Sequence, residues 1–246
     1  MAARQQRGSY LFFMDRIIHI SFLSLDNFYN HYPALNNIAI NDYQLVTVIW
    51  NIFLVLLPLA FYIFLKSYWR RTGLRKFYQK IAAVILFIFW LLFFPNTAYI
   101  ITDIRHLLNY CPLDSPDRVC ADNAWMIMVF FIYSGFGWVS FYYLLKLMSD
   151  LAHEIFKKLR PSFFAALIIP ITSLGVLLGL LNRFNSWDVF LYPFWLWRVF
   201  LVYLLNINYF IDWLIFTLGL YLLYFAGGYL FKKINTDGAN IGERNK

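Results

Sequence analysis

Five stretches of this chain are each at least twenty residues long and carry no more than one charged side chain. A helix rises 1.5 Å per residue, so about 20 apolar residues cross a hydrocarbon core roughly 30 Å thick. Soluble domains carry roughly a quarter charged residues, whereas this 246-residue chain has 14% charged and 61% hydrophobic residues. We therefore predict an all-α, polytopic transmembrane helical bundle embedded in a lipid bilayer.

About six spans are expected. Five strong segments cover residues 43–65, 78–101, 124–147, 162–181 and 209–231. A sixth, residues 9–28, contains Asp15, Arg16 and His19, so it either spans or lies in the interface. It has no small-residue cleavage site and should be retained. Residues 189–206 are aromatic and interrupted, which predicts an interfacial or re-entrant helix. One transmembrane domain thus covers residues 1–234, and we expect a disordered cytoplasmic tail at 235–246.

Basic residues gather in the loops on one predicted side of the membrane. The largest group follows the second segment and consists of Lys66, Arg70, Arg71, Arg75, Lys76 and Lys80. Smaller basic groups at 146–160, 232–233 and 4–7 fall on the same side if residues 9–28 span. Because cytoplasmic loops are enriched in Lys and Arg, we predict that both termini are cytoplasmic. The basic residues that give the net charge of +8 are thus explained by the orientation of the chain in the membrane. Nucleic acid is therefore not an expected partner.

The orientation places Cys111 and Cys120 together in an exoplasmic loop. That side of the membrane permits oxidation, so a disulfide between them is one interpretation and two independent thiols are the other. Their spacing does not match a Cys-x-x-Cys metal or redox motif.

Two motifs are more polar than their positions require. The first, residues 95–106, ends the third segment, and the second, residues 182–188, follows the fifth. A helix turns by 100° per residue, so four polar side chains of the first motif fall within about 80° of one another and form one stripe: Asn96, Tyr99, Asp103 and His106. Both motifs end on the exoplasmic face, so we expect them to meet. The candidate ligand-binding residues are Asn96, Tyr99, Asp103, His106, Arg183, Asn185 and Asp188.

Ionisable groups at the bilayer boundary are costly unless paired. We expect Arg183 to pair with Asp103 or Asp188, and His106 to pair with Asp103. The cluster could hold a divalent metal through Asp103, His106 and Asp188, since carboxylate and imidazole are metal ligands. Asp103 could instead orient His106 as a general base, or Arg183 could bind a phosphate or carboxylate headgroup. Alternatively, these side chains only cap helices and join them.

Small residues and prolines indicate how the helices pack. Gly175 with Gly179, and the run at 134–137, permit close helix approach. Prolines should kink helices and free a backbone carbonyl, and three lie within or at the ends of spans: Pro58, Pro95 and Pro170.

The motifs also resemble a known family, the bacterial membrane proteins grouped as domain of unknown function 1361. Its pattern has a tryptophan-asparagine opening of one span, a P-N-x-x-Y-x-x-T-D-x-x-H-L segment and an R-x-N-S-W-D turn followed by proline. Here these are Trp50-Asn51, residues 95–107, and residues 183–188 with Pro193. The chain departs from the family at Gly179-Leu180, where glycine-arginine is frequent. The resemblance implies a bacterial cytoplasmic (inner) membrane and these site residues, and it implies no activity.

Three functions remain open from the sequence. The leading hypothesis is an exoplasmic polar pocket that binds a small polar ligand, a lipid headgroup or a metal. The second is a non-catalytic subunit or assembly factor that partners other membrane protein subunits. The third is an envelope- or lipid-modifying enzyme using Asp103 and His106. No nucleophile-elbow, zinc-protease, P-loop or haem-attachment motif occurs, so neither a catalytic residue nor a cofactor is assigned.

Overall fold

The computed structural model describes residues 39–40, 43–106 and 125–244. This part of the chain is almost entirely helical, apart from the antiparallel pair β1 (Ala39–Ile40) and β2 (Tyr43–Gln44), in which Ala39 lies opposite Gln44. The helices are α4 (Leu45–Thr72), α5 (Phe77–Phe93), α6 (Pro95–Thr102), the 3-10 helix η1 (Asp103–His106), α8 (Trp125–Ile155), α9 (Pro161–Asn182), α10 (Asp188–Leu191), α11 (Pro193–Leu205) and α12 (Ile207–Arg244). The predicted all-α class is confirmed.

Five helical segments of the described residues are long and apolar enough to cross a membrane. They are Leu45–Thr72, Phe77–His106, Trp125–Ile155, Pro161–Asn182 and Ile207–Phe231. Large apolar side chains are exposed on the outside of each segment, for example Phe64, Ile85, Phe131, Leu167 and Leu222. A surface of this kind suits hydrocarbon rather than water. The predicted segment 9–28, Cys111 and Cys120 lie outside the described residues.

Several helices continue past the ends that the apolar runs predicted. α4 extends to Thr72 with Arg70 and Arg71 in its last turn, where cations are favoured by the helix dipole. α12 is helical through Arg244, whereas we expected disorder from Asn235. No proline follows Ile207, so each further residue can add one helical hydrogen bond. The predicted interfacial stretch forms α10 and the 13-residue helix α11.

The span from Phe77 to His106 is broken at Pro95, which begins α6. Proline has no N–H and its ring disturbs the preceding turn. Two side chains of α6 bond to the carbonyls just before the break: Asn96 Nδ2 donates to the Phe93 carbonyl (2.9 Å) and Thr97 Oγ1 donates to the Phe94 carbonyl (2.7 Å). In a membrane a backbone group left without a partner is costly, so these bonds let the break exist inside the bundle.

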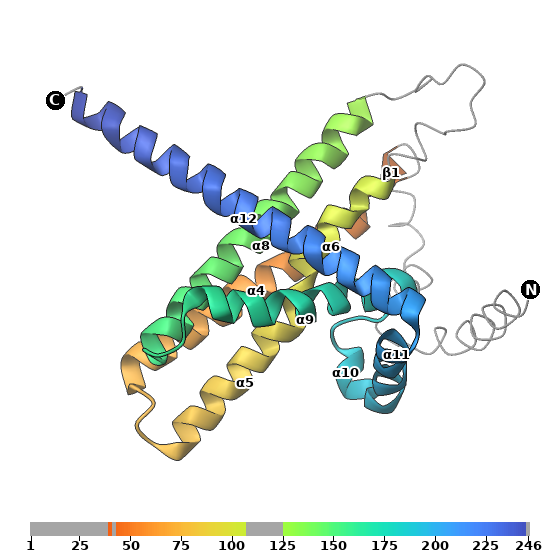
Figure 1. The fold of residues 1–246 in the computed structure, drawn as a ribbon, viewed down its shortest axis with the longest axis horizontal. Coiled ribbons are helices and arrows are strands. Elements are labelled where there is room, and N and C mark those ends of the chain that lie inside the picture. The colour runs from red at the N-terminus through yellow and green to blue at the C-terminus, as the bar shows by residue number, and fades with distance from the viewer. Residues whose placement is uncertain (1–38, 41–42, 107–124, 245–246) are drawn as a thin grey trace, which may run out of the picture.

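Helix α6 lies between α8 and α9 because glycines allow it to approach closely. A Cβ added at Gly137 of α8 would lie 2.9 Å from the Thr97 carbonyl oxygen, and one added at Gly175 of α9 would lie 2.7 Å from the Pro95 ring. Both predicted groups of small residues thus contribute a close contact. Figure 1 shows α6 near the middle of the bundle, with α10 and α11 gathered at one side.

The core beneath this contact is aromatic. Trp90 and Phe94 stack with ring centroids 4.6 Å apart, and Phe94 in turn stacks on Phe141 of α8 at 5.6 Å. All three side chains are completely buried. Aromatic pairs of this kind bury large areas and add about 0.5–1.5 kcal/mol beyond that burial. The end of α5, just before the break at Pro95, is therefore firmly held.

Helix α12 is attached to its neighbours through side-chain donors. Because Pro170 has no N–H, the Ala166 carbonyl loses its helical partner, and the Tyr221 hydroxyl donates to it at 2.6 Å. Trp213 Nε1 donates to the Pro170 carbonyl (3.0 Å), and Trp138 Nε1 donates to the Leu223 carbonyl (2.8 Å). The carbonyl that Pro170 frees, that of Ala166, is thus used to fix α9 to α12.

Candidate functional site

Three segments that are far apart in the sequence meet at one end of the bundle. Ring centroids of Trp50 in α4 and Trp187 before α10 lie 6.3 Å apart. Asn51 Nδ2 donates a long hydrogen bond to Asp103 Oδ2 (3.5 Å), and Asn96 Nδ2 donates to Ser186 Oγ (3.1 Å). These contacts join the two polar motifs to each other and both to α4. We call the polar side chains gathered here the polar site: Asn51, Asn96, Tyr99, Asp103, Arg105, His106, Tyr133, Arg183, Ser186 and Asp188.

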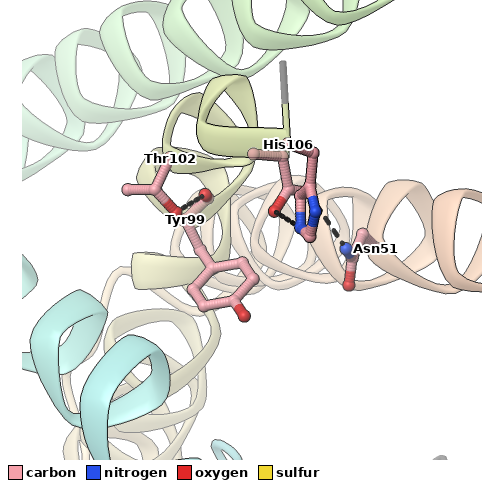
Figure 2. A network of polar contacts seen from close by, with 5 residues as sticks. Asn51, Tyr99, Thr102 and His106 are labelled. Atoms are coloured by element: carbon pink, nitrogen blue, oxygen red, sulfur yellow. Dashed lines mark hydrogen bonds and ion pairs between the residues drawn. The ribbon is translucent and has the colours of Figure 1, made fainter. Parts of the chain in front are cut away.

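Asp103 lies where α6 changes into the 3-10 helix η1. Its backbone N–H bonds to the carbonyls of Ile100 and Ile101, and its side chain is almost completely buried. In a 3-10 helix, side chains three residues apart lie over one another, and His106 Nε2 accordingly lies 4.0 Å from Asp103 Oδ1. The predicted pairing of these two residues is present. Figure 2 shows Asn51 and His106 facing each other in this network.

The four polar residues that were expected to form one stripe contact three different helices. Asn96 and Tyr99 face α9 and the turn after it, because the Tyr99 ring would lie 3.5 Å from a Cβ added at Gly179. Asp103 bonds to α4, and the imidazole of His106 stacks on Phe130 of α8 at 6.0 Å. In Figure 2 the Tyr99 ring points away from Asn51 and His106. The change to 3-10 geometry after Thr102 ends the regular spacing on which a single stripe depends.

The second motif begins with a backbone conformation that is unusual for its residue. Arg183 follows α9 in the left-handed region (φ 59°, ψ 25°), with its N–H on the Leu178 carbonyl. Glycine is favoured at this position and other residues are strained there. The guanidinium of Arg183 is exposed, and its charge reaches both Tyr99 and His106, as does that of Arg105. Strain of this kind often persists where a side chain has a function.

Asp188 closes the same turn. Its Oδ2 accepts the backbone N–H of Asn185 at 2.7 Å, although the side chain is 97% buried. Burial raises the pKa of Asp188 above its usual range, and the hydrogen bonds from Asn185 oppose that rise only in part. In the described part of the chain, no ion pair joins Arg183 to Asp103 or to Asp188. The pairing of Arg183 that we expected is therefore not seen among these residues.

Several buried polar atoms around the polar site have no hydrogen-bond partner among the described residues. The Tyr133 hydroxyl lies beside the Asn51 amide but makes no hydrogen bond of good geometry with it, and Trp187 Nε1 and Asp188 Oδ1 are also unpartnered. Buried polar groups are nearly always hydrogen-bonded. Two of these groups are donors, Tyr133 beside Asn51 and Trp187 beside Trp50, so the site can offer hydrogen bonds to acceptor atoms that the described residues do not supply.

Sequence reasoning from motif polarity overlooked several members of the polar site. Asn51 and Tyr133 lie in the middle of apolar runs, and Ser186 and Arg105 lie inside the two motifs without having been singled out. Asn51 was named only within the family pattern, as Trp50-Asn51, although an asparagine within an apolar span is itself an indication of a polar contact. Tyr133 is one of 18 tyrosines, and nothing in its local sequence distinguishes it.

A metal site receives no support from the geometry of the described residues. No three histidine, cysteine, aspartate or glutamate side chains among them lie close enough together to hold a metal ion. The predicted set of Asp103, His106 and Asp188 brings only its first two members together, at 4.0 Å.

The fold and the apolar surface define the class: this is a helical membrane protein, and five helical segments of its described residues are long and apolar enough to cross a bilayer. Residues 50–224 match the family model described as "Protein of unknown function (DUF1361)", and the chain belongs to that family. The predicted resemblance is confirmed, and the matched region contains all three segments that meet at the polar site. No curated protein and no solved structure shows significant similarity to the chain.

Proposed function

We propose that this protein resides in a bacterial cytoplasmic membrane with both termini in the cytoplasm, and that its polar site binds an oxyanion-bearing headgroup or solute at the outer face. The orientation follows from the basic residues at the end of α4 and the start of α5, which favour the cytoplasmic side. Asn51 lies about 30 Å along α4 from Arg71, at 1.5 Å per residue. The polar site then lies near the opposite face.

The observation behind the binding proposal is a pair of unpartnered donors in a site where the charges of two arginines also act on Tyr99 and His106. The Tyr133 hydroxyl and Trp187 Nε1 are buried without acceptors in the described chain, and Arg105 and Arg183 place positive charge on the same neighbourhood. A phosphate or carboxylate group accepts several hydrogen bonds and is bound strongly by arginine. Asp103 and Asp188 could accept hydroxyl or amine hydrogens from the remainder of such a ligand.

The test compares compounds that remain bound to purified full-length protein. Solvent extracts of wild type, Arg183→Gln and Asp103→Asn are analysed by mass spectrometry. Arg198→Gln is the control, because that guanidinium stacks on the rings of Phe194 and Trp195 instead. We expect a phosphate- or carboxylate-bearing compound with wild type and the control, and its loss from the other two variants at unchanged unfolding temperature.

The contrary result is also specific. If wild type retains no such compound and both site variants only lower the unfolding temperature, the polar site holds helices together and binds nothing.

Orientation is tested separately in a cysteine-free background, with single cysteines at position 75 or 183 and a membrane-impermeant maleimide. Labelling of position 75 from outside intact cells would reverse the proposed topology.

A second candidate function is that of a non-catalytic subunit or assembly factor of a membrane complex. This function is favoured by the uneven burial of the spans. In the most apolar part of α12, 17% of the residues are buried within the bundle, compared with 50% in the corresponding part of α9. Such a helix presents most of its surface to lipid or to another protein. Crosslinking from exposed Leu218 and Leu222 to a defined partner band, absent when the probe is placed at buried Leu220, would favour this function.

A further inference from the structure

The end of α4 remote from the polar site carries a second polar feature. A hollow of about 430 Å³ lies along its last turns, and we call it the basic hollow. Its lining residues are Tyr62, Ile63, Lys66, Ser67, Arg70 and Arg71. They form two adjacent rows at four-residue spacing on one helix.

Lysine 66 is held in a defined position within the basic hollow. Its Nζ donates to the Tyr62 hydroxyl at 3.0 Å and lies 5.4 Å from the centroid of the same ring. Tyr62 itself is buried against the core, so it is a firm support for the ammonium group. An ammonium group has three donors, and this contact uses one. The remaining donors can serve a ligand without further ordering of the side chain.

The three cations of the basic hollow have no carboxylate partner among the described side chains. Within residues 43–106 and 125–231, no ion pair involves Lys66, Arg70 or Arg71. Like charges one turn apart on a helix destabilise it. The helix dipole offsets this for Arg70 and Arg71 in the last turn, but its effect fades beyond that turn and does not reach Lys66. An anion bound among the three would remove the repulsion.

The surface next to the cations is apolar toward the middle of α4. Ile63, which lines the hollow, and its neighbour Phe64 are 54% and 61% exposed. A soluble phosphate would not use such a surface, whereas an acyl chain would lie along it. A basic pocket where a spanning helix reaches the interface is the arrangement that anionic lipid headgroups recognise.

We propose that the basic hollow binds the phosphate group of an anionic glycerophospholipid in the leaflet at this end of the bundle. Lys66 and Arg70 contact the phosphate, and Ile63 contacts the acyl chain. The proposal concerns a site separate from the polar site and does not depend on what that site binds.

The test uses full-length protein in nanodiscs of phosphatidylcholine with increasing phosphatidylglycerol, with the number of lipids retained after extraction counted by native mass spectrometry. We expect one phosphatidylglycerol to be retained by wild type. Lys66→Gln and Arg70→Gln should each weaken that retention roughly fivefold. Lys66→Arg should preserve it within about twofold, because a cation remains, and this variant shows that substitution at the position is tolerated. Lys80→Gln is the matched control, because this basic residue of α5 is exposed and lies outside the hollow.

Three results would overturn the proposal. Equal retention of phosphatidylcholine would mean that the hollow does not recognise charge. An equal loss in Lys80→Gln would mean that overall positive charge, and not the hollow, attracts the lipid. Thermal stabilisation of detergent-solubilised protein by inorganic phosphate, with the same dependence on Lys66 and Arg70, would identify a soluble anion instead of a lipid. A compound bound at the polar site is lost in Arg183→Gln and kept in Lys66→Gln, whereas a lipid bound at the basic hollow shows the reverse, so the two proposals fail independently.

Discussion

The two ends of α4 carry polar chemistry of different kinds. At the first end, Asn51 is nearly buried and bonds to Asp103, 52 residues further along the chain. At the other, Lys66 bonds to Tyr62, one turn away on the same helix, and Arg70 and Arg71 are exposed. The polar site is therefore a product of tertiary packing, whereas the basic hollow needs little more than one helix. Substitutions that loosen packing should damage the first end and spare the second.

The largest effect is expected where α6 meets α8. In Gly137→Val the new side chain would meet the Thr97 carbonyl oxygen at 2.9 Å and Ile100 at 3.0 Å. Overpacking of this kind costs about 1–3 kcal/mol, and a backbone carbonyl has little room to move away. We expect the unfolding free energy in SDS titration to fall by that amount. Gly135→Val is the control, since a Cβ at Gly135 meets nothing within 4 Å. Equal losses in both variants would refute the close packing of α6.

A smaller loss is expected from Asn96→Ala. This change removes the hydrogen bonds to the Phe93 carbonyl (2.9 Å) and to Ser186 (3.1 Å). These hydrogen bonds are half-buried, so we expect their loss, which includes the contact between the two polar motifs, to cost about 0.5–1.5 kcal/mol. The measurement is again SDS titration, with exposed Asn208→Ala as the matched control. Wild-type stability of Asn96→Ala would indicate that the motifs are held together by other contacts.

The pH dependence of stability sharpens the comparison further. The pKa of Asp188 is raised by burial, so the protonated form is favoured in the folded state. The contribution of the Asp188 carboxyl to folding stability is fully present below the ordinary aspartate pKa. It is lost as the pH rises through the raised pKa of the folded state. Asp188→Asn keeps an acceptor for the Asn185 N–H and cannot ionise. We therefore expect this variant to gain stability relative to wild type between pH 4 and pH 7. A stability difference between Asp188→Asn and wild type that stays constant over this pH range would contradict a raised pKa for Asp188.

The smallest effect is expected at the opposite end of α4. Arg71 is exposed and makes no ion pair with the side chains described, and surface substitutions usually change stability by less than about 0.5 kcal/mol. Arg71→Gln in a zwitterionic detergent without anionic lipid should therefore unfold like wild type. A loss as large as that of Asn96→Ala would break the contrast between the two ends.

Local chemistry accounts for what the sequence predicted correctly. The five apolar runs, the all-α class and the pairing of His106 with Asp103 each depend on spacing along one segment. The resemblance to the family was carried by the same local motifs and is confirmed over residues 50–224. Segment ends were less accurate, because charged and polar residues continue α4 and α12 beyond their apolar parts.

The sequence by itself determined that the chain must be a bundle of apolar helices with polar residues at their ends. The hydrocarbon of a bilayer offers no hydrogen-bond partners, so the polar backbone of each apolar segment must satisfy its own groups within a helix. Only the tertiary structure decided which polar residues act together. Asn51 and Tyr133 joined Asp103, and Arg183 did not pair with it, because helix crossing and the change to 3-10 geometry after Thr102 set the direction of each side chain. These directions depend on contacts such as those of Gly137 and Gly175 with α6, which link residues far apart in the chain and leave no periodic signal in the sequence.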